Sequence, residues 1–160
     1  MKALRILISM LVIVVAISVF PEKIRGANYE ALTTADFEKT FTNAQDIFYK
    51  LLLPNSMART TPRSKREEEK LLQSFQGIAA TFKNHANISV PFLKAKVAST
   101  LPDAEDPALC ALQLLFEIND QASWKVIRDA QSNPHEVVAE WAKEMVKHKQ
   151  DVLWGFRSQK

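Results

Sequence analysis

The stretch that decides the fold is residues 106–118, with the sequence DPALCALQLLFEI. Asp106 is a residue type that caps helices, and Pro107 suits the first helical position, so we expect a helix to begin here. From Ala108 to Ile118 the side chains are apolar on almost every side. A helix that is hydrophobic all round is normally covered by other elements. The sequence therefore predicts that this helix is the central and most buried one.

Two amphipathic helices are predicted before this central segment. The first follows Thr33 and Thr34, ends at Pro54, and has apolar residues at alternating spacings of four and three, namely Phe37, Phe41, Ala44, Phe48 and Leu51. The second begins with a capping box formed by Ser64 and Glu67 and continues to His85 with the stripe Leu71, Phe75, Ile78 and Phe82. The polar segment 54–63 between them shows no periodicity, so we predict a loop there.

Three further helices complete the expected fold. A short one begins at Ser89 to Pro91 and ends at Pro102, with Phe92, Leu93, Val97 and Leu101 as its apolar residues. A weak break at 119–122 precedes the next, which carries Trp124, Ile127 and Ala130. The last begins at Asn133 and Pro134 and runs to about Gly155, with the stripe Val138, Trp141, Met145 and Val152. Five or six amphipathic helices with short links predict an all-α fold, a small bundle forming one domain over residues 27–160.

The chain begins with the pattern of a secretory signal peptide. Residues 1–5 form a short start with the basic residues Lys2 and Arg5, residues 6–20 form an apolar run, and residues 21–26 form a polar tail. A helix that spans a membrane needs roughly 18 to 20 apolar residues, so removal of this segment is favoured over anchoring. We expect cleavage between Gly26 and Ala27, with a site after Ser18 as the alternative. The product would be secreted and extracellular, with no membrane segment left.

Removal of the signal changes the charge of the chain. The full sequence has 21 basic and 18 acidic residues, and the first 26 residues take four and one of these, which leaves 17 of each. A protein with no net charge has no general attraction for phosphate backbones, which argues against nucleic acid as a partner. After residue 26 only Gly77 and Gly155 remain as glycines, which argues against hairpins, dinucleotide folds and phosphate loops.

No group of residues in the sequence indicates catalysis or a cofactor site. Cys110 is the one cysteine and lies among apolar neighbours, which favours a buried structural thiol over a nucleophile; the alternative is a disulfide that joins two copies into a homodimer. The histidines His85, His135 and His148 are scattered. The helical row Glu140, Glu144 and His148 is interpreted as a solvated face rather than a metal site. We therefore expect no enzyme, no metal and no cofactor.

Two short motifs are typical of secreted chains. Arg63-Ser64-Lys65-Arg66 resembles the cleavage motif of furin-like secretory proprotein convertases, whose acidic pockets recognise spaced basic side chains such as Arg63, Lys65 and Arg66. The competing interpretation is that Ser64 caps a helix and the basic residues are merely solvated. Asn87-Ile88-Ser89 is an N-glycosylation sequon in a predicted turn, which would make the product a glycoprotein if Asn87 is used.

The last apolar residues of the chain are the strongest candidates for contact with a partner. The segment 152–157 reads VLWGFR, and aromatic residues beside an arginine are enriched at binding hot spots. The candidate contact residues are Leu153, Trp154, Phe156 and Arg157. The alternative is that these residues fold back as ordinary core.

The leading functional hypothesis is a secreted, non-enzymatic helical protein that contacts an extracellular protein, as in signalling, defence or effector roles. A first alternative is a carrier of an apolar small molecule such as a lipid, which predicts a closed cavity among Phe37, Phe41, Phe75, Phe82, Leu112 and Phe116. A second alternative is a precursor that is cleaved after Arg66 to release active fragments.

Overall fold

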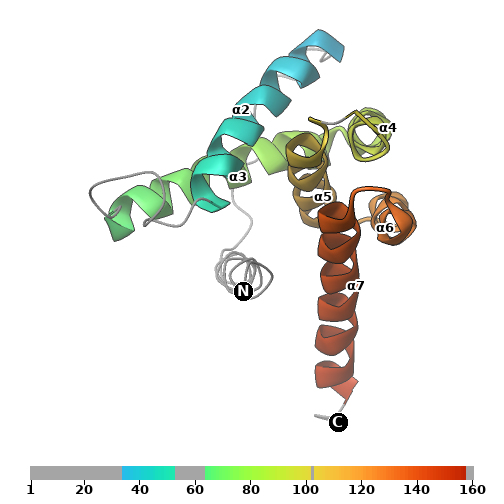
Figure 1. Cartoon of the computed structure of the whole chain (residues 1–160). Helices are drawn as coiled ribbons and strands as arrows, with labels where there is room; N and C mark the ends of the chain where they lie inside the picture. Colours follow the sequence, from blue (N-terminus) through green and yellow to red (C-terminus); the bar gives the residue numbers. More distant parts are fainter. Residues whose placement is uncertain (1–33, 53–63, 102, 158–160) are drawn as a thin grey trace.

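The computed structural model describes residues 34–52, 64–101 and 103–157, and of residues 150–157 it describes the backbone alone. This part of the chain forms six α-helices and one 3₁₀ turn, with no strand (Figure 1). The all-α prediction is confirmed for these residues. The predicted signal segment, its cleavage sites at Ser18 and at Gly26 and Ala27, and the predicted loop 54–63 all lie outside the described residues.

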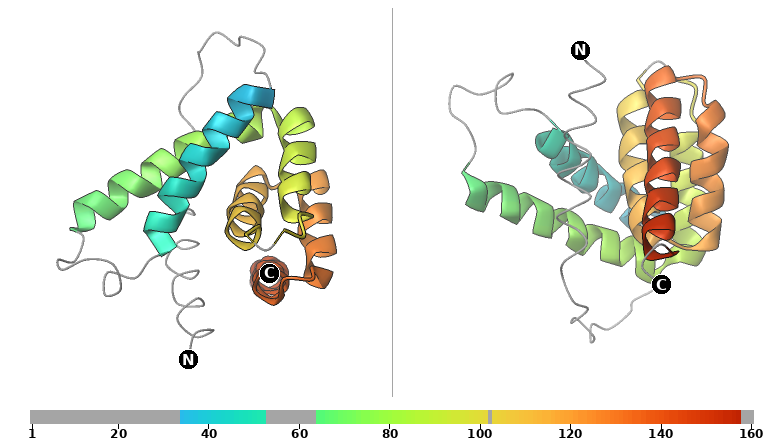
Figure 2. Two further views of the ribbon diagram at one scale, coloured as in Figure 1. Left: turned by 45° about the horizontal axis from the view of Figure 1, so that its top comes forward. Right: turned by 90° about the horizontal axis from the view of Figure 1, so that it is seen from below.

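The helices follow one another with short links. Their bounds are α2 Thr34–Leu52, α3 Lys65–Asn84, α4 Ala86–Val97, α5 Glu105–Ile118, α6 Gln121–Asp129 and α7 Glu136–Arg157, with the 3₁₀ turn η1 at Ala130–Ser132. Figure 2 shows α2 and α3 as a pair that extends to one side, while α4, α5, α6 and α7 stand together. The chain thus has a long helical hairpin joined to a group of four helices.

The core is built around α5, as the apolar composition of this helix predicts. Every residue from Ala108 to Leu115 is buried, and Ile118 one turn later is buried too. Such complete burial requires neighbours on all sides, and α2, α3, α4, α6 and α7 all contact α5. The prediction that 108–118 is the central helix is therefore confirmed.

The pair α2 and α3 is antiparallel and is joined by phenylalanine rings. Phe37 near the start of α2 contacts Phe82 near the end of α3, with ring centroids 5.3 Å apart. Phe48 near the end of α2 contacts Phe75 at 6.0 Å. All four side chains are at most 3% exposed. The predicted apolar stripes of these two helices thus face each other, and both reach the core.

The start of α4 differs from the prediction. The helix begins at Ala86 rather than at Ser89, so Asn87 lies in its first turn and Pro91 lies inside it. The hydroxyl of the buried Ser89 donates to the carbonyl oxygen of Phe82 at 2.7 Å, which fixes α4 directly against the end of α3. Because α4 also ends earlier, at Val97, the predicted apolar Leu101 lies beyond it and is 63% exposed.

Two predicted helix caps are also displaced. Helix α5 begins at Glu105, so Asp106 is not its cap and Pro107 is its third residue, where a missing N–H costs no helical bond. Helix α7 begins at Glu136 instead of Pro134. The side chain of Asn133 accepts from the N–H of His135 at 2.9 Å and donates to the carbonyl of Val97 at 2.8 Å. Asn133 therefore ties this turn to the end of α4 and does not cap α7.

Candidate functional site

A cluster of side chains joins the end of α5 to the start of α6 and to the middle of α7. We call it the Trp124 junction, made of Phe116, Asn119, Trp124, His148 and Lys149. Asn119 ends α5 in the left-handed conformation, with φ of 57°. Its side-chain oxygen accepts the indole N–H of Trp124 at 2.6 Å. Asp120 then caps α6 in a reciprocal box with Ser123. This short turn places Trp124 where the other two helices meet it.

Two aromatic contacts and one cation complete the Trp124 junction. Phe116 of α5 contacts the Trp124 ring edge to face at 5.5 Å and the His148 ring of α7 at 6.4 Å. The ammonium of Lys149 lies 3.7 Å from the centroid of the Trp124 ring. A cation at this distance is attracted by the negative face of the indole. Trp124 itself is 4% exposed, so the half-buried Lys149 side chain covers the edge of the core.

The Trp124 junction carries positive charge that the described residues do not neutralise. Burial lowers the pKa of Lys149, and the nearby positive charge of Arg128 lowers it further. Arg128 follows Trp124 by four residues on α6, so both lie on the same side of that helix. Within 34–52, 64–101 and 103–149, no carboxylate forms an ion pair with Arg128 or Lys149.

The sequence contains a signal for this junction, namely Asn119, that the pattern of apolar residues does not reveal. An asparagine directly after an apolar helix is a common left-handed terminator. Asn119 was predicted only as part of a weak break, and Arg128 and Lys149 were not predicted as site residues. Their proximity depends on the crossing of α6 and α7, which no spacing along the chain reveals.

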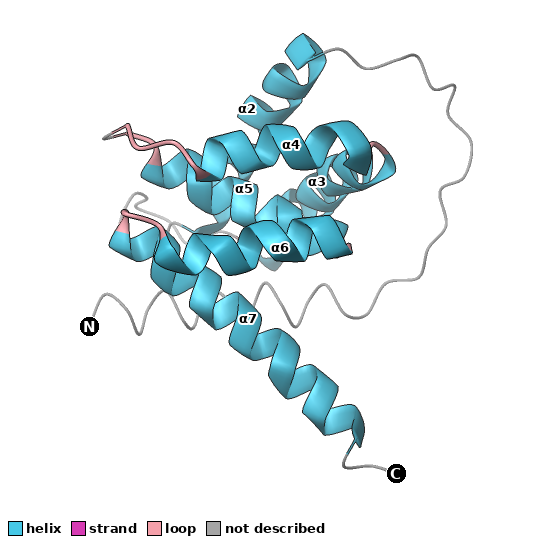
Figure 3. Ribbon diagram, turned by 90° about the vertical axis from the view of Figure 1, so that its right-hand side faces the viewer, coloured by secondary structure: helices cyan, strands magenta, loops and turns pink. Residues whose placement is uncertain are grey.

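Helix α7 continues beyond the junction as one unbroken helix to Arg157. Figures 1 and 3 show its last turns leaving the group of helices that bury its first half. Val138, Trp141 and Met145 are buried on one face, and the same spacing of three and four continues in the sequence through Val152 and Phe156. The side chains of Leu153, Trp154, Phe156 and Arg157 lie outside the described residues.

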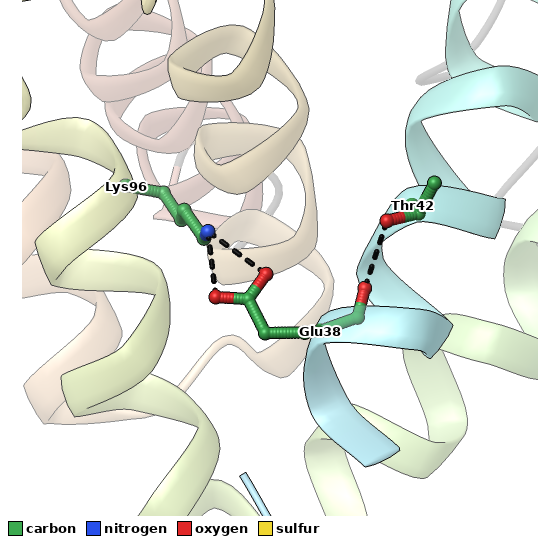
Figure 4. Close-up of polar contacts among 3 residues, drawn as sticks. All are labelled: Glu38, Thr42 and Lys96. Atoms are coloured by element: carbon green, nitrogen blue, oxygen red, sulfur yellow. Dashed lines mark hydrogen bonds and ion pairs between the residues drawn. The ribbon is translucent and has the colours of Figure 1, made fainter. Parts of the chain in front are cut away.

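A second polar link joins α2 to α4. Lys96 donates to both carboxylate oxygens of Glu38 at 2.8 and 2.9 Å (Figure 4). Its ammonium also lies 5.5 Å from the ring centroid of Phe41 and 5.1 Å from that of Phe92. Thr42 donates to the Glu38 carbonyl one turn along α2. Because Lys96 is already paired, this link holds two helices together and leaves no charge over for a ligand.

Glu117 is a carboxyl group whose pKa the fold changes. Burial raises the pKa of Glu117, although a hydrogen bond from Gln113 and the charge of Lys83 lower it in part. The side chain of Gln113 is itself buried and donates to Glu117 at 3.1 Å. The groups that act on the Glu117 carboxylate are thus the Gln113 amide and the charge of Lys83.

The last residues of the candidate cleavage motif form the start of helix α3. Ser64 caps α3, accepting from the N–H of Glu67 at 3.3 Å, while the Glu67 carboxylate accepts from the Ser64 N–H at 2.8 Å. The predicted capping box is therefore confirmed. Lys65 and Arg66 are exposed in the first turn of α3, and Arg63 lies outside the described residues. A protease that needs an extended chain across Arg66 must first unwind this turn.

Cys110 occupies the middle of α5 and has no exposed surface. Burial raises the pKa of its thiol. A nucleophile or a metal ligand needs the thiolate, which this position disfavours. A disulfide between two copies would require Cys110 to leave the core. The described residues also contain no group of three or more side chains able to hold a metal ion.

The residues proposed to line a carrier cavity are divided among separate contacts. Phe37, Phe41 and Phe82 pack around the ring of Phe92. Phe75 packs with Phe48, and Phe116 packs with Trp124. Leu112 is fully buried in α5. The carrier hypothesis therefore stays a prediction for these residues.

The sequon lies on the surface at the start of α4. Asn87 is exposed, while Ser89 is buried and bonded to Phe82. Ile88 between them is 45% exposed. The Asn87 side chain is thus accessible for a glycan, and Ser89 has a structural role independent of glycosylation.

The described residues thus form six helices, and the last of them extends beyond the helices that bury its first half. None of the described helices combines the length and the apolar character needed to cross a membrane. Comparison with models of protein families, with curated proteins and with solved structures finds no match.

Proposed function

We propose that this chain is a secreted, non-enzymatic helical protein that acts by binding another protein outside the cell, using the distal part of α7. The observation that carries the proposal is the continuation of α7 to Arg157, beyond the helices that bury Val138, Trp141 and Met145. When the apolar stripe of a helix continues beyond the part that its own protein buries, the exposed part is a common anchor for helix-in-groove recognition.

The residue types of the distal α7 segment support a protein partner. Trp and Arg are enriched among the residues that contribute most to binding energy at protein interfaces, and Phe is enriched at the interface core. Residues 152–157 contain Trp154, Phe156 and Arg157 within two helical turns. The first half of α7 anchors this segment through Trp141 and Met145, so the helix is positioned before a partner binds. Such preorganisation reduces the entropy lost on association.

A secretory origin is supported by the first 26 residues, which have the charge and apolar pattern of a cleaved signal. Expression of the full chain in secretory cells is expected to release a protein that begins at Ala27. Amino-terminal sequencing and intact mass of the material in the medium test this. Two fragments that meet at Arg66 would instead favour the precursor hypothesis.

Binding to cells tests the contact hypothesis. The secreted protein, labelled with a fluorophore, is expected to bind cells of its own source saturably, and trypsin treatment of those cells is expected to abolish binding. Phe156→Ala should weaken binding by about tenfold or more, since a hot-spot aromatic contributes roughly 2 kcal/mol. Gln73→Ala on the exposed side of α3 is the matched control and should bind normally. Binding that survives trypsin or ignores Phe156 would contradict the proposal.

A further inference from the structure

We propose that the surface covered by α2 is a helix-binding site that holds α2 without a covalent connection, so that cleavage after Arg66 yields a two-part protein and releases neither piece. This surface belongs to α3, α4, α5 and α7, and we call it the α2-binding surface. The inference does not depend on the contact proposed for α7. It concerns the alternative in which a precursor is cleaved to release active fragments.

The apolar stripe of α2 is covered by helices that follow Arg66 in the chain. Phe37, Phe41 and Phe48 are at most 3% exposed, and Ala44 has no exposed surface. Aromatic rings that contact these phenylalanines belong to Phe75, Phe82, Phe92 and Trp141. The four α2 residues are spaced by four, three and four positions, which is the spacing by which an amphipathic helix occupies an apolar groove. Cleavage after Arg66 therefore leaves the anchors on one piece and their groove on the other.

An ion pair adds orientation to the apolar contact. Lys96 of α4 donates to both carboxylate oxygens of Glu38 on α2, at 2.8 and 2.9 Å. The Lys96 side chain is 28% exposed, and its ammonium lies 5.5 Å from the centroid of the Phe41 ring. A charge pair beside an apolar interface fixes the register of the two partners. Glu38 thus gives α2 one preferred position on the α2-binding surface.

The bond between Arg66 and Glu67 lies away from this surface. Every residue from 64 to 70 is exposed, so opening the first turn of α3 uncovers no buried side chain. Hydrolysis consumes one water and leaves a carboxylate on Arg66 and an α-ammonium group on Glu67. Among the described residues, the ring contact nearest the cut joins Phe75 to Phe48, about two turns further along α3. Fraying at the new end of α3 therefore leaves the α2-binding surface intact.

Cleavage of the purified secreted chain with furin tests the inference. Denaturing mass spectrometry should show two pieces that meet between Arg66 and Glu67. Size-exclusion chromatography at about 10 μM should show one species that contains both. Cys110 is the one cysteine of the chain, so no disulfide can join the pieces and their association is non-covalent. Elution as two separate species would overturn the inference.

A second route keeps the test decisive if furin does not cut the folded chain. The recognition sequence of factor Xa, inserted between Ala58 and Arg59, moves the cut to a position before the Ser64 cap of α3. Both pieces should again elute together after cleavage. Separation of the pieces in this variant would overturn the inference in the same way.

Variants connect the association to the named contacts. Glu38→Lys should raise the dissociation rate of the smaller piece by at least about tenfold, because it places a like charge against Lys96. Asp46→Lys is the matched control, since Asp46 lies on the same helix and pairs with Lys50 within α2. The rate is followed by exchange with an excess of the fluorescent smaller piece, and circular dichroism before cleavage shows that each variant is folded. Equal rates for Glu38→Lys and Asp46→Lys would overturn the assigned orientation.

One further outcome concerns the source of the bound helix. A cleaved protein that sediments as a dimer would place α2 of one copy on the α2-binding surface of another, and would overturn the assignment of this surface to its own α2. Cell binding that depends on Phe156 is measured separately. The protein contact proposed for α7 therefore stands or fails independently of this result.

Discussion

Asn119 and Trp124 are joined by a 2.6 Å hydrogen bond from the indole N–H to the amide oxygen, across the turn between α5 and α6. Asn119 both ends the central helix and satisfies the one polar atom of a nearly buried tryptophan. The ring of the same tryptophan contacts the Lys149 ammonium and the Phe116 ring. One turn thus determines how α6 and α7 meet the core.

Replacement of Asn119 should separate its two roles. Asn119→Gly keeps the left-handed conformation but removes the acceptor, and should reduce the free energy of unfolding by about 1 kcal/mol. Asn119→Ala loses the acceptor and also strains the backbone, so about 2 kcal/mol is expected. Asn119→Asp keeps an oxygen acceptor and should be nearly neutral. Urea unfolding followed by tryptophan fluorescence measures the series; equal losses for glycine and aspartate would contradict the role of the bond.

Glu117 should make the protein less stable as pH rises above the acid range. Burial raises its pKa in the folded state above the ordinary value of 4.5. Between these two pKa values the unfolded chain releases its proton while the folded chain keeps it, so the free energy of unfolding falls with increasing pH. Above the folded pKa the loss is complete and constant.

Glu117→Gln removes this titration and keeps an oxygen that can accept from Gln113. We expect a higher free energy of unfolding at neutral pH and a flatter profile between about pH 4 and pH 8. Urea unfolding across this range is the measurement. Glu69→Gln, on the exposed start of α3, is the control and should leave the profile of the parent unchanged. A variant with the parent's slope would show that Glu117 ionises normally.

Cys110 should be inert while the protein is folded. The thiol is fully buried and burial raises its pKa, so little thiolate is present. Labelling with a thiol reagent at neutral pH should be at least about a hundredfold slower than in urea, since it requires the core to open. Ser74→Cys, placed on exposed α3, should label rapidly in the same assay. A disulfide-linked dimer on a non-reducing gel of native protein would contradict this expectation.

Substitutions in the sequon should show that glycosylation depends on Asn87, whereas stability depends on Ser89. Asn87→Gln is expected to remove a glycan from the secreted protein, seen as loss of the mass shift on deglycosylation, with unchanged melting temperature. Ser89→Thr keeps both the sequon and the hydroxyl that bonds to Phe82, so both properties should persist. Ser89→Ala loses the glycan and about 1 kcal/mol of stability as well. An unglycosylated parent from secretory cells would show that the exposed Asn87 is not used.

Several elements of the fold followed from local chemistry. The Ser64 and Glu67 capping box and the apolar run 108–118 were both predicted, because each depends only on residues within a few positions. The start of α4 was predicted wrongly because Ser89 bonds to Phe82, a contact across a helix junction. Asp106 was predicted to cap α5, but the helix begins at Glu105 after a turn closed by Leu101 and Ala104.

By itself, the sequence determined that the described chain is helical, that its centre is residues 108–118, and which faces of α2, α3 and α7 are buried, because helical periodicity and capping act over one or two turns. Only the tertiary structure decided that Lys149 of α7 lies over the Trp124 ring of α6, and that the last turns of α7 leave the other helices. These facts arise from the crossing of two helices whose residues are far apart in the sequence, and no periodicity along the chain encodes a distance of that kind.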